Sequence, residues 1–502
     1  MPDIGVAALI RGLADEDTFI PWSFNDAGDG PDVSEDYAGE LEAARARTGH
    51  DEAVVVGECQ INGRRMALII SDFDFLAGSV GRRACQLLVG AFARAQAASL
   101  PVFASPASGG TRMQEGTPAF VLMADVAAAV ARFRESGGPL IVWLRNPTTG
   151  GVMATWGSLG TITLGQPGAL AGFLGPRVFG MLRGTTFPAG VQTTDNLAAK
   201  GIIDETVELE HLRPYLTRAL SVLHPLHRLD RPDRPDPLLP EAGPIGGKAP
   251  FDAWQGVLKT RRPERPGVQE VLAAGSDATR LSGTGEGERS DAVVLAIARF
   301  AGQPCIVVGQ DRAAQAAGAG LNPAALRTAR RGFRLAAQLR LPLVTVIDTA
   351  GAELSPEAEE AALAGEIARC LAEMTMLPSP TVSVLLGMGC GGGALALMPA
   401  DRVVAAEHAW LSPLPLEGAS IIRYRNPGHA PRMANEQNIS AVALKERGIV
   451  DVVIDEQPDA ADEPAEFARR VVQIVGRQLR DLTHMEPCAR LRDRQLRLSG
   501  DL

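Results

Sequence analysis

The chain has 502 residues, a formal net charge of −10 and 46% hydrophobic residues. This length exceeds what one hydrophobic core organises, so two or three domains are expected. The excess of negative charge argues against a nucleic acid or an anionic membrane as a partner recognised through bulk electrostatics. With 22% charged residues, the composition is ordinary for a folded soluble protein.

The six cysteines stand singly and form no C-x-x-C pair. This pattern predicts neither a disulfide framework nor a zinc ribbon, and it favours a reducing cytoplasm as the compartment. No metal site is expected, because H-E-x-x-H is absent and Asp72 and Asp74 are interpreted as turn residues at a strand end. The first 19 residues predict an amphipathic helix, and no apolar run has the length of a bilayer span.

A proline-rich stretch at residues 224–250 divides the chain nearly in half. It holds seven prolines among alternating charges, a composition that excludes a helix or a central strand and predicts a stiff surface linker. The expected organisation is a helical N-terminal extension at 1–35, a first domain at 36–223, the linker at 224–250, a second domain at 251–485 and a tail at 486–502.

The two halves repeat one order of strands and turns. Residues 53–75 and 292–314 each contain two apolar strands joined by a polar turn, LPVFASPASGG at 100–110 matches LPLVTVIDTAG at 341–351, and residues 139–155 match 380–396. Gly110 and Gly151 are 41 residues apart, as are Gly351 and Gly392. The repeat predicts two stacked copies of one α/β fold, each with a parallel or mixed sheet covered on both faces.

In each half, two glycine-containing turns follow consecutive strands and open helices. T-T-G-G-V at 148–152 and C-G-G-G-A at 390–394 place glycines at a helix N-terminus, where the first amides lack an intrahelical partner. Glycine lets a ligand approach those amides, and the helix dipole favours an anion or a developing oxyanion. The favoured chemistry is a thioester enolate held by two backbone amides. Close packing without a ligand is the competing interpretation.

Other chemistries fit these residues less well. Neither turn has the G-x-x-x-x-G-K-[ST] or G-x-G-x-x-G pattern, and the acidic residues of GTGEGE at 283–288 would repel a phosphate. Ser108 lies in P-A-S-G-G rather than G-x-S-x-G, and no histidine completes a triad. Arg112 and Glu115 are interpreted as a structural pair on one helix. Glu417 is interpreted as a buried carboxylate that stabilises a turn.

Taken together, these motifs closely resemble the carboxyltransferase of bacterial acetyl-CoA carboxylase. The first half is similar to its β subunit in DFDFLAGSVG at 72–81, SPASGGTRMQEG at 105–116, NPTTGGV at 146–152 and AGFLGPRV at 171–178. The second half is similar to its α subunit in AWQGVLKTRRPERP at 253–266, VTVIDTAGA at 344–352, GMGCGGGALA at 387–396 and PLEGASIIRYR at 415–425. The resemblance covers residues 36 to 455, most of the chain.

The resemblance implies two tandem crotonase-like domains of α/β class, β-like and then α-like. It implies transfer of a carboxyl group from carboxybiotin, carried on a separate protein, to the α-carbon of acetyl-CoA or another short acyl-CoA, giving malonyl-CoA from acetyl-CoA. The CoA thioester is then a substrate, and no cofactor is tightly bound. The implied partners are a biotin carboxylase and a biotin carboxyl carrier protein. An active site between facing subunits predicts a homodimer or a higher homo-oligomer.

Carried over to this sequence, the resemblance implies backbone donors in both halves. Gly150 and Gly151 would donate to the thioester oxygen, and Gly392 and Gly393 to the ureido oxygen of biotin. Arg177 would neutralise a phosphate of CoA or hold a helix in place. The implied substrate-binding residues are Gly109, Gly110, Thr111, Arg177, Gly351 and Ala352.

Departures from the family pattern gather on the biotin side. T-A-G-A-E-L-S at 349–355 stands where the family has T-P-G-A-Y-P-G, and P-L-E-G at 415–418 stands where it has S-P-E-G. Cys390 and Gly391 replace Gly and Ser. Two alternatives therefore stay open, a biotin-independent malonyl-thioester decarboxylase and a non-catalytic assembly subunit of a carboxylase complex. The preferred acyl chain length and the pathway served stay open as well.

Overall fold

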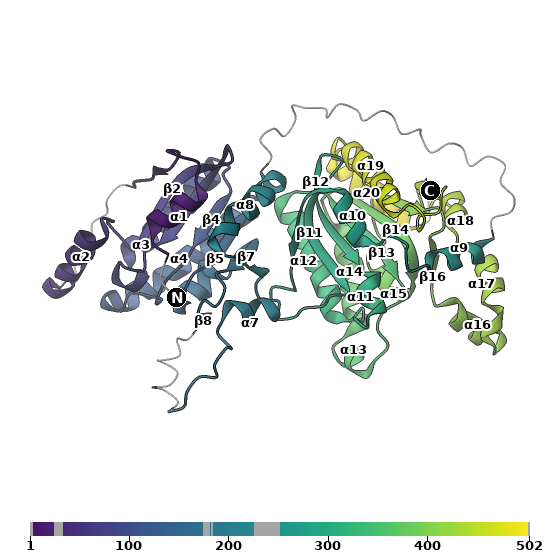
Figure 1. Ribbon diagram of the computed structural model, residues 1–502, viewed down its shortest axis with the longest axis horizontal. Helices are drawn as coiled ribbons and strands as arrows, with labels where there is room; N and C mark the ends of the chain where they lie inside the picture. Colours follow the sequence, from purple (N-terminus) through teal and green to yellow (C-terminus); the bar gives the residue numbers. More distant parts are fainter. Residues whose placement is uncertain (1–3, 25–33, 174–180, 182–183, 225–251, 500–502) are drawn as a thin grey trace. The chain divides into compact units, whose positions relative to one another are not determined.

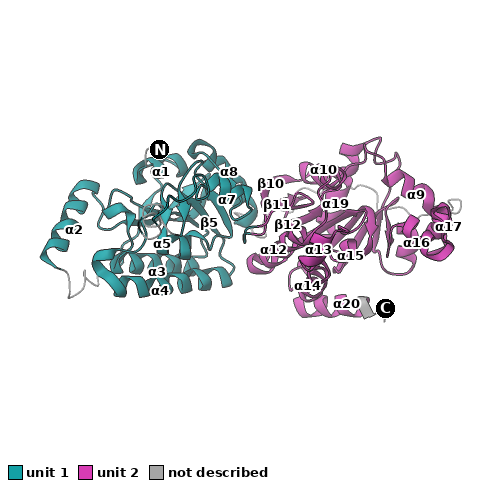
Figure 2. Ribbon diagram, turned by 90° about the horizontal axis from the view of Figure 1, so that it is seen from below, with its two compact units in different colours: residues 1–226, 285–287 teal, residues 227–284, 288–502 magenta. Residues whose placement is uncertain are grey.

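The computed structural model describes residues 4–24, 34–173, 181, 184–224 and 252–499 (Figure 1). It divides into two compact units, residues 1–226 with 285–287 and residues 227–284 with 288–502 (Figure 2). The proline-rich stretch at 224–250 lies outside the described residues apart from His224. The expected boundaries of the N-terminal extension and the C-terminal tail stay predictions.

Unit 1 is built on a seven-stranded sheet of order β1-β2-β3-β4-β5-β7-β9, and β6 pairs with β8 separately. β1, β2 and β3 pair antiparallel, whereas every pair from β3 to β9 is parallel. The strands are β1 (Ile20–Pro21), β2 (Val54–Ile61), β3 (Arg64–Ser71), β4 (Val102–Ser105), β5 (Leu140–Leu144), β6 (Thr148–Thr149), β7 (Ile162–Gly165), β8 (Ala171–Gly172) and β9 (Glu205–Thr206).

Helices cover both faces of this sheet. α3 and α4 pack against each other over one face, and α1 with α8 lies against β2 on the chain's other layer. α1 is the expected amphipathic opening helix, with Val6, Leu9 and Leu13 buried. The helices of unit 1 are α1 (Val6–Leu13), α2 (Glu35–Thr48), η1 (Leu76–Gly78), α3 (Arg82–Ala97), η2 (Met113–Glu115), α4 (Gly116–Glu135), α5 (Gly150–Val152), η3 (Met153–Gly157), α7 (Thr194–Ala199) and α8 (Leu209–Leu223).

Unit 2 has a sheet of order β10-β11-β12-β13-β14-β15-β17, with β16 paired to β14. α12 lies on β11 and β12, while α19 packs on α10 and contacts β11 and β14. Its strands are β10 (Ser276–Leu281), β11 (Val293–Phe300), β12 (Gln303–Gln310), β13 (Leu343–Thr349), β14 (Thr381–Cys390), β15 (Arg402–Ala406), β16 (Trp410–Ser412) and β17 (Val452–Ile454).

The helices of unit 2 complete the layers over this second sheet. They are α9 (Ala253–Thr260), α10 (Val268–Ala274), α11 (Arg312–Ala316), α12 (Pro323–Leu339), α13 (Pro356–Glu360), α14 (Leu363–Met376), α15 (Gly391–Leu395), α16 (Leu416–Tyr424), η4 (Pro427–His429), α17 (Ala430–Glu436), α18 (Ala441–Glu446), α19 (Pro464–Thr483) and α20 (Pro487–Ser499). α20 is therefore helical within the segment expected as a tail.

The repeat seen in the sequence is a repeat of topology. The hairpin β2–β3 pairs Val54 with Ser71, and the hairpin β11–β12 pairs Val293 with Gln310. In each unit a parallel strand follows the hairpin (β4 or β13), and the next parallel strand (β5 or β14) leads toward the glycine-rich turn. The predicted two copies of one α/β fold are confirmed.

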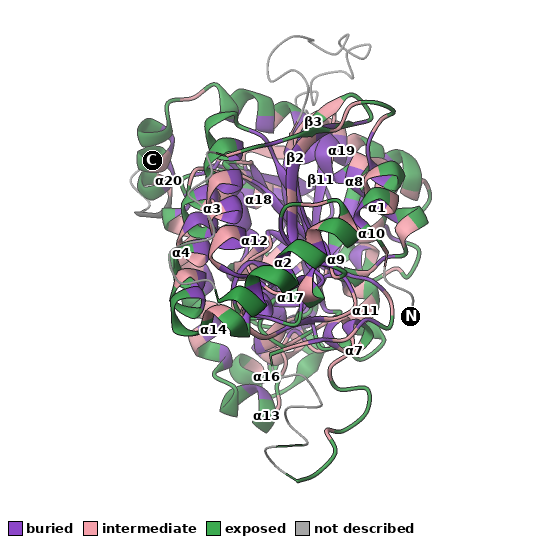
Figure 3. Ribbon diagram, turned by 90° about the vertical axis from the view of Figure 1, so that its left-hand side faces the viewer, coloured by how far each residue is buried: buried purple, intermediate pink, exposed green. Residues whose placement is uncertain are grey.

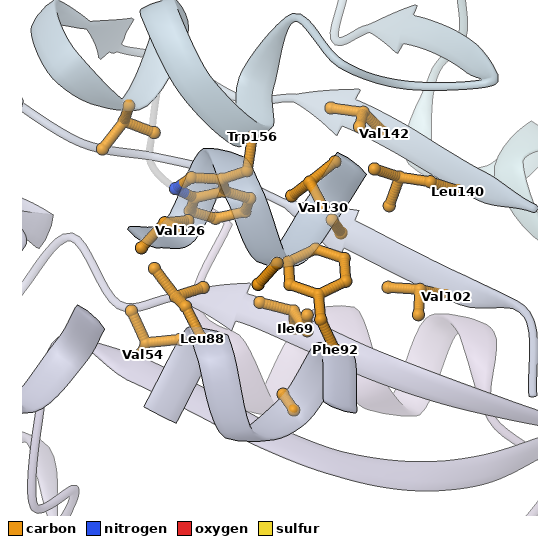
Figure 4. Close-up of a cluster of buried hydrophobic side chains, with 14 of the residues drawn as sticks. Val54, Ile69, Leu88, Phe92, Val102, Val126, Val130, Leu140, Val142 and Trp156 are labelled. Carbon is orange, nitrogen blue, oxygen red and sulfur yellow. The ribbon is translucent and has the colours of Figure 1, made fainter. Parts of the chain in front are cut away.

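The core of unit 1 lies between the sheet and the pair α3–α4. Leu88 and Phe92 from α3 and Val126 and Val130 from α4 meet sheet residues such as Ile69 (Figure 4). The indole of Trp156 closes this cluster beside the glycine-rich turn and is fully buried. The strands of the sheets are correspondingly buried while α2 is mostly exposed (Figure 3). Packing in this core therefore fixes where the turn at 148–151 begins.

One helix differs from the expectation that no apolar run reaches membrane length. Residues 113–135 are long and apolar enough to cross a membrane by length and composition alone. Val126, Val130 and Phe133 of this helix are buried in the core of unit 1. The same apolar residues therefore have partners within the fold.

Candidate active site

In unit 1 the two glycine turns lie against each other. A methyl group added at Gly110 would lie 3.4 Å from the Cα of Gly150. Gly110 has φ +112° and Gly150 has φ +63°, conformations that L side chains rarely adopt. The residues Gly109, Gly110 and Thr111 on one side and Gly150 and Gly151 on the other are thus brought together as the sequence predicted.

Several of the amides in these turns already have acceptors within the chain. Gly109 donates to the carbonyl of Ala77 at 3.0 Å, and Gly110 donates to Ser108 Oγ at 3.0 Å. The Gly150 amide, which was expected to be bare, donates to the carbonyl of Phe173 at 2.8 Å. This contact engages the donor that the thioester oxygen would need, so Gly150 contributes its backbone conformation and close approach in this structure.

Two amides of the unit 1 site keep their hydrogen free. Within the described residues, the amides of Thr111 and Gly151 have no acceptor. Gly151 lies in the first turn of α5, where no intrahelical acceptor exists. A methyl group at Gly151 would lie 2.9 Å from the side-chain oxygen of Thr111, so the two residues are neighbours. They form the pair of free donors nearest in kind to an oxyanion hole.

Unit 2 repeats this geometry. Gly351 has φ +134° and donates to Thr349 Oγ1 at 3.1 Å, as Gly110 donates to Ser108. Gly391 has φ +63° and stands where Gly150 stands in unit 1. Gly392 and Gly393 follow it in the first turn of α15, and a methyl group at Gly393 would lie 3.1 Å from the amide nitrogen of Ala352. Gly351, Ala352, Gly392 and Gly393 are therefore brought together as predicted.

The turn at Gly110 is held by a buried arginine. Arg112 is 0% exposed and its guanidinium binds Glu52, with Nη1 to Oε2 at 3.0 Å. It also donates to the carbonyl of Ser79, which joins the loop after β3 to the turn after β4. The expected pair with Glu115 is a looser contact of 3.7 Å. The structural interpretation of Arg112 thus stands, with Glu52 as the partner that sequence reasoning missed.

A second buried arginine supports the other turn of unit 1. Arg145 follows β5 and its Nε donates to Ser105 Oγ at 2.8 Å. Its Nη1 donates to the carbonyl of Ile4 at 2.6 Å, and its Nη2 donates to the carbonyl of Ser71. Arg145 therefore joins the ends of β3, β4 and β5 immediately before the glycine turn. Its position three residues before T-T-G-G was the one signal available in the sequence.

The substitutions of the second site have defined surroundings. Cys390 is buried at the N-terminus of α15, and burial, with a smaller contribution from Glu417, raises the pKa of its thiol to about 11. Glu417 itself is 40% exposed and pairs with Arg261 at 2.8 Å, and this hydrogen bond lowers the pKa of its carboxyl. The expectation of a buried Glu417 was wrong, because Arg261 of α9 binds it at the surface.

Two further observations concern predicted absences and placements. Arg177 lies outside the described residues, so its role stays a prediction. His408, Glu456 and Asp459 have ligand atoms within 4.8 Å of one another, a grouping that the sequence did not indicate. Arg265 binds both oxygens of Glu456, and Lys259 Nζ lies 2.8 Å from His408 Nε2. Cationic side chains thus hold the positions that a metal ion would need.

Comparison with known proteins decides the family. Residues 249–500 match the family described as acetyl co-enzyme A carboxylase carboxyltransferase-like. Over 98% of its length the chain is 49% identical to 98% of a probable biotin-dependent acyl-coenzyme A carboxylase beta3 subunit from Mycobacterium tuberculosis (strain ATCC 25618 / H37Rv). The chain belongs to the acyl-CoA carboxylase carboxyltransferase family.

Other members of the carboxyltransferase family confirm the order of the two halves. The chain is 38% identical to the acetyl-coenzyme A carboxylase carboxyl transferase subunits beta/alpha of Salinispora arenicola (strain CNS-205), over 90% of this chain and 81% of that protein. The crystal structure of transcarboxylase 12S, a hexamer with methylmalonyl-coenzyme A and methylmalonic acid bound, matches with a TM-score of 0.72 and 19% identity. That match covers 96% of this chain and 90% of the other. The likeness confirms the tandem crotonase-like fold.

Proposed function

We propose that this protein moves a carboxyl group from carboxybiotin on a carrier protein to the α-carbon of acetyl-CoA or another short acyl-CoA. The observation that carries the proposal is the duplication of one donor arrangement. Thr111 and Gly151 in unit 1 correspond to Ala352 and Gly392 in unit 2 by their 41-residue repeat and their backbone conformations. A transferase with two carbonyl-bearing substrates needs two such sites, whereas a decarboxylase needs one.

The unit 1 site would hold the acyl-CoA. Removal of a proton from the α-carbon moves negative charge onto the thioester oxygen, and the amides of Gly151 and Thr111 would donate to that oxygen. Such donors contribute about 3 kcal/mol each to a transition state when they are preorganised. The left-handed conformation of Gly150 places these amides, and its own amide is committed to Phe173. This modifies the pair of donors implied by the family resemblance.

The unit 2 site would hold the ureido oxygen of carboxybiotin with the amides of Gly392 and Gly393. When the N–CO₂ bond breaks, the electron pair moves onto the ureido nitrogen and its oxygen, and the amides stabilise this charge. The nitrogen then takes the proton from the α-carbon, and the enolate carbon forms the new bond to CO₂. Buried Cys390 is a protonated thiol at neutral pH and has no part in this step.

The proposed reaction requires other proteins. A biotin carboxylase and a biotin carboxyl carrier protein would supply carboxybiotin, in keeping with the relative named as a biotin-dependent carboxylase subunit. We propose at least a homodimer, supported by the hexamer of transcarboxylase 12S. We propose the cytoplasm as the compartment, supported by the free cysteines, of which only Cys488 is exposed.

The test is the reverse reaction of the purified full chain. Malonyl-CoA is supplied with and without free biotin, and release of acetyl-CoA is followed by liquid chromatography, with methylmalonyl-CoA as a second substrate. The proposal expects release that depends on biotin. Release at the same rate without biotin would assign the chain as a decarboxylase. CoA-thioester binding without release from either substrate would assign it as an assembly subunit.

A further inference from the structure

Gln310 connects the two turns of the unit 2 site. It is the last residue of β12 and is fully buried. Its Oε1 accepts from the amide of Asp348 at 3.1 Å, and its Nε2 donates to the carbonyl of Gly393 at 2.7 Å. A backbone amide only donates and a carbonyl only accepts, so these contacts fix the orientation of the side-chain amide. One side chain thus joins the segment that leads to Gly351 to the first turn of α15.

Asp348 extends this connection to the strand that enters the glycine-rich turn. Its Oδ1 accepts from the amide of Met388 at 2.9 Å, where the register of β13 and β14 shifts between Ile347 and Thr349. The carboxylate therefore supplies an acceptor at the irregularity of the ladder. Arg312 lies 4.0 Å from its Oδ2, which has no hydrogen-bond partner among the described residues. The position of Asp348 thus depends strongly on the contact with Gln310.

Unit 1 has no counterpart of this connection. Ser71 stands at the end of β3 where Gln310 ends β12, and Ala107 stands where Asp348 stands in the repeat. Neither side chain reaches the turn at Gly150. Arg145 joins the strand ends of unit 1 instead. The effect of removing Gln310 is therefore expected on one substrate and not on the other.

We infer that Gln310 is a positioning residue for the biotin side of the reaction, which holds the amides of Ala352 and Gly392 at a fixed separation. The inference rests on the proposed function for the chemistry, but the clamp itself is a property of the fold. Backbone donors stabilise a developing charge only when they are in place before it forms. A small displacement of such groups lowers turnover more than it lowers substrate binding.

The first test replaces Gln310 by methionine, which keeps the volume and removes both hydrogen bonds. In the reaction of malonyl-CoA with free biotin, Gln310→Met is expected to lower kcat by about tenfold to a hundredfold, with the KM for malonyl-CoA unchanged. The control is Gln303→Met at the other end of the same strand, which is expected to match the wild type. Wild-type kcat in Gln310→Met, or a raised KM for malonyl-CoA with a lowered melting temperature, would overturn the inference.

The second test uses protonation to restore the donor. In Gln310→Glu the neutral acid can accept from Asp348 and donate to Gly393, whereas the carboxylate repels the Gly393 carbonyl. Burial raises the pKa of such a carboxyl, so the neutral form gains at accessible pH. The charged groups around this position are Asp348, Asp311, Arg312, Arg265 and Glu456. The kcat of Gln310→Glu relative to the wild type is expected to rise by about tenfold from pH 9 to pH 6, and a constant ratio would overturn the inference.

The third test does not depend on the reaction. Amide hydrogen exchange in peptides that cover residues 387–397 is expected to be faster in Gln310→Met than in the wild type, with peptides of unit 1 unchanged. Unchanged exchange at 387–397 would overturn the inference whether or not the enzyme is active. Faster exchange in a protein whose wild type shows no biotin-dependent release would support the clamp and remove the proposed function.

Discussion

Arg112 and Glu52 form a salt bridge in which both side chains are almost fully buried, at 0% and 2% exposure. The pair links the turn that carries Gly110 to the residue before the first long strand, across 60 positions of the sequence. A buried ion pair contributes little net stability, but removal of one partner leaves the other charge without compensation. The pair therefore predicts a specific pattern of stability changes.

Replacing Arg112 by methionine is expected to lower the free energy of unfolding of unit 1 by about 3 to 5 kcal/mol, because Glu52 would stay buried and unpaired. The double variant R112M with E52Q is expected to recover much of this loss. Denaturant unfolding measures both. The control is Arg65→Met at the exposed pair Arg65–Glu58, where a change below about 1 kcal/mol is expected. Equal losses for R112M and R65M would contradict the buried role of Arg112.

Replacing Gly150 by alanine is expected to lower turnover of malonyl-CoA by at least about tenfold, since misplaced oxyanion donors lose most of their effect. The added methyl would lie 3.1 Å from the Cα of Gly110, and the residue has φ +63°. Gly49 is the matched control, because it has φ +73° and no atom within 4 Å of an added methyl. Steady-state kinetics should show wild-type turnover in Gly49→Ala. A similar loss in both variants would mean that backbone strain alone is responsible.

Ser108 and Thr349 hold equivalent glycine amides, so their removal should affect different substrates. Ser108→Ala is expected to change the kinetic parameters for malonyl-CoA, and Thr349→Val those for biotin, because each loses the acceptor of Gly110 or Gly351. A loss of about tenfold is expected for each. Thr349→Ser keeps the hydroxyl and should behave as the wild type. If Thr349→Val altered only malonyl-CoA, the assignment of the two halves would be reversed.

Cys390 is expected to resist alkylation in the folded protein. The pKa of its thiol is raised to about 11, so at pH 8 only about one thiol in a thousand is the reactive thiolate. Iodoacetamide at this pH should label exposed Cys488 and leave Cys390 unmodified, as measured by peptide mass spectrometry. Biotin-dependent turnover should survive the treatment. Rapid labelling of Cys390 with loss of turnover would contradict its buried, protonated state.

The glycine turns could be predicted from the sequence because they are local patterns repeated at one spacing. Gly110 with Gly151 and Gly351 with Gly392 recur at 41 residues, and the structure brings both pairs of turns together. The commitment of the Gly150 amide to Phe173 could not be predicted, because that acceptor comes from a later segment that has no local pattern.

The residues that support the turns were harder to predict for the same reason. Arg112 was interpreted with Glu115, three positions away, but its main partner Glu52 comes from the segment before β2. Gln310 carries no motif, and its role depends on two strand ends that meet only in the folded sheet. Glu417 was expected to be buried, and Arg261 from α9 instead pairs with it at the surface.

The most direct test of the account follows the carboxyl group itself. Malonyl-CoA labelled with ¹³C at its free carboxyl is incubated with the protein and free biotin, and mass spectrometry determines where the label is found. The account predicts labelled carboxybiotin in an amount that equals the acetyl-CoA formed at early times. Label found only as bicarbonate, at the same rate with and without biotin, would contradict carboxyl transfer between the two substrates.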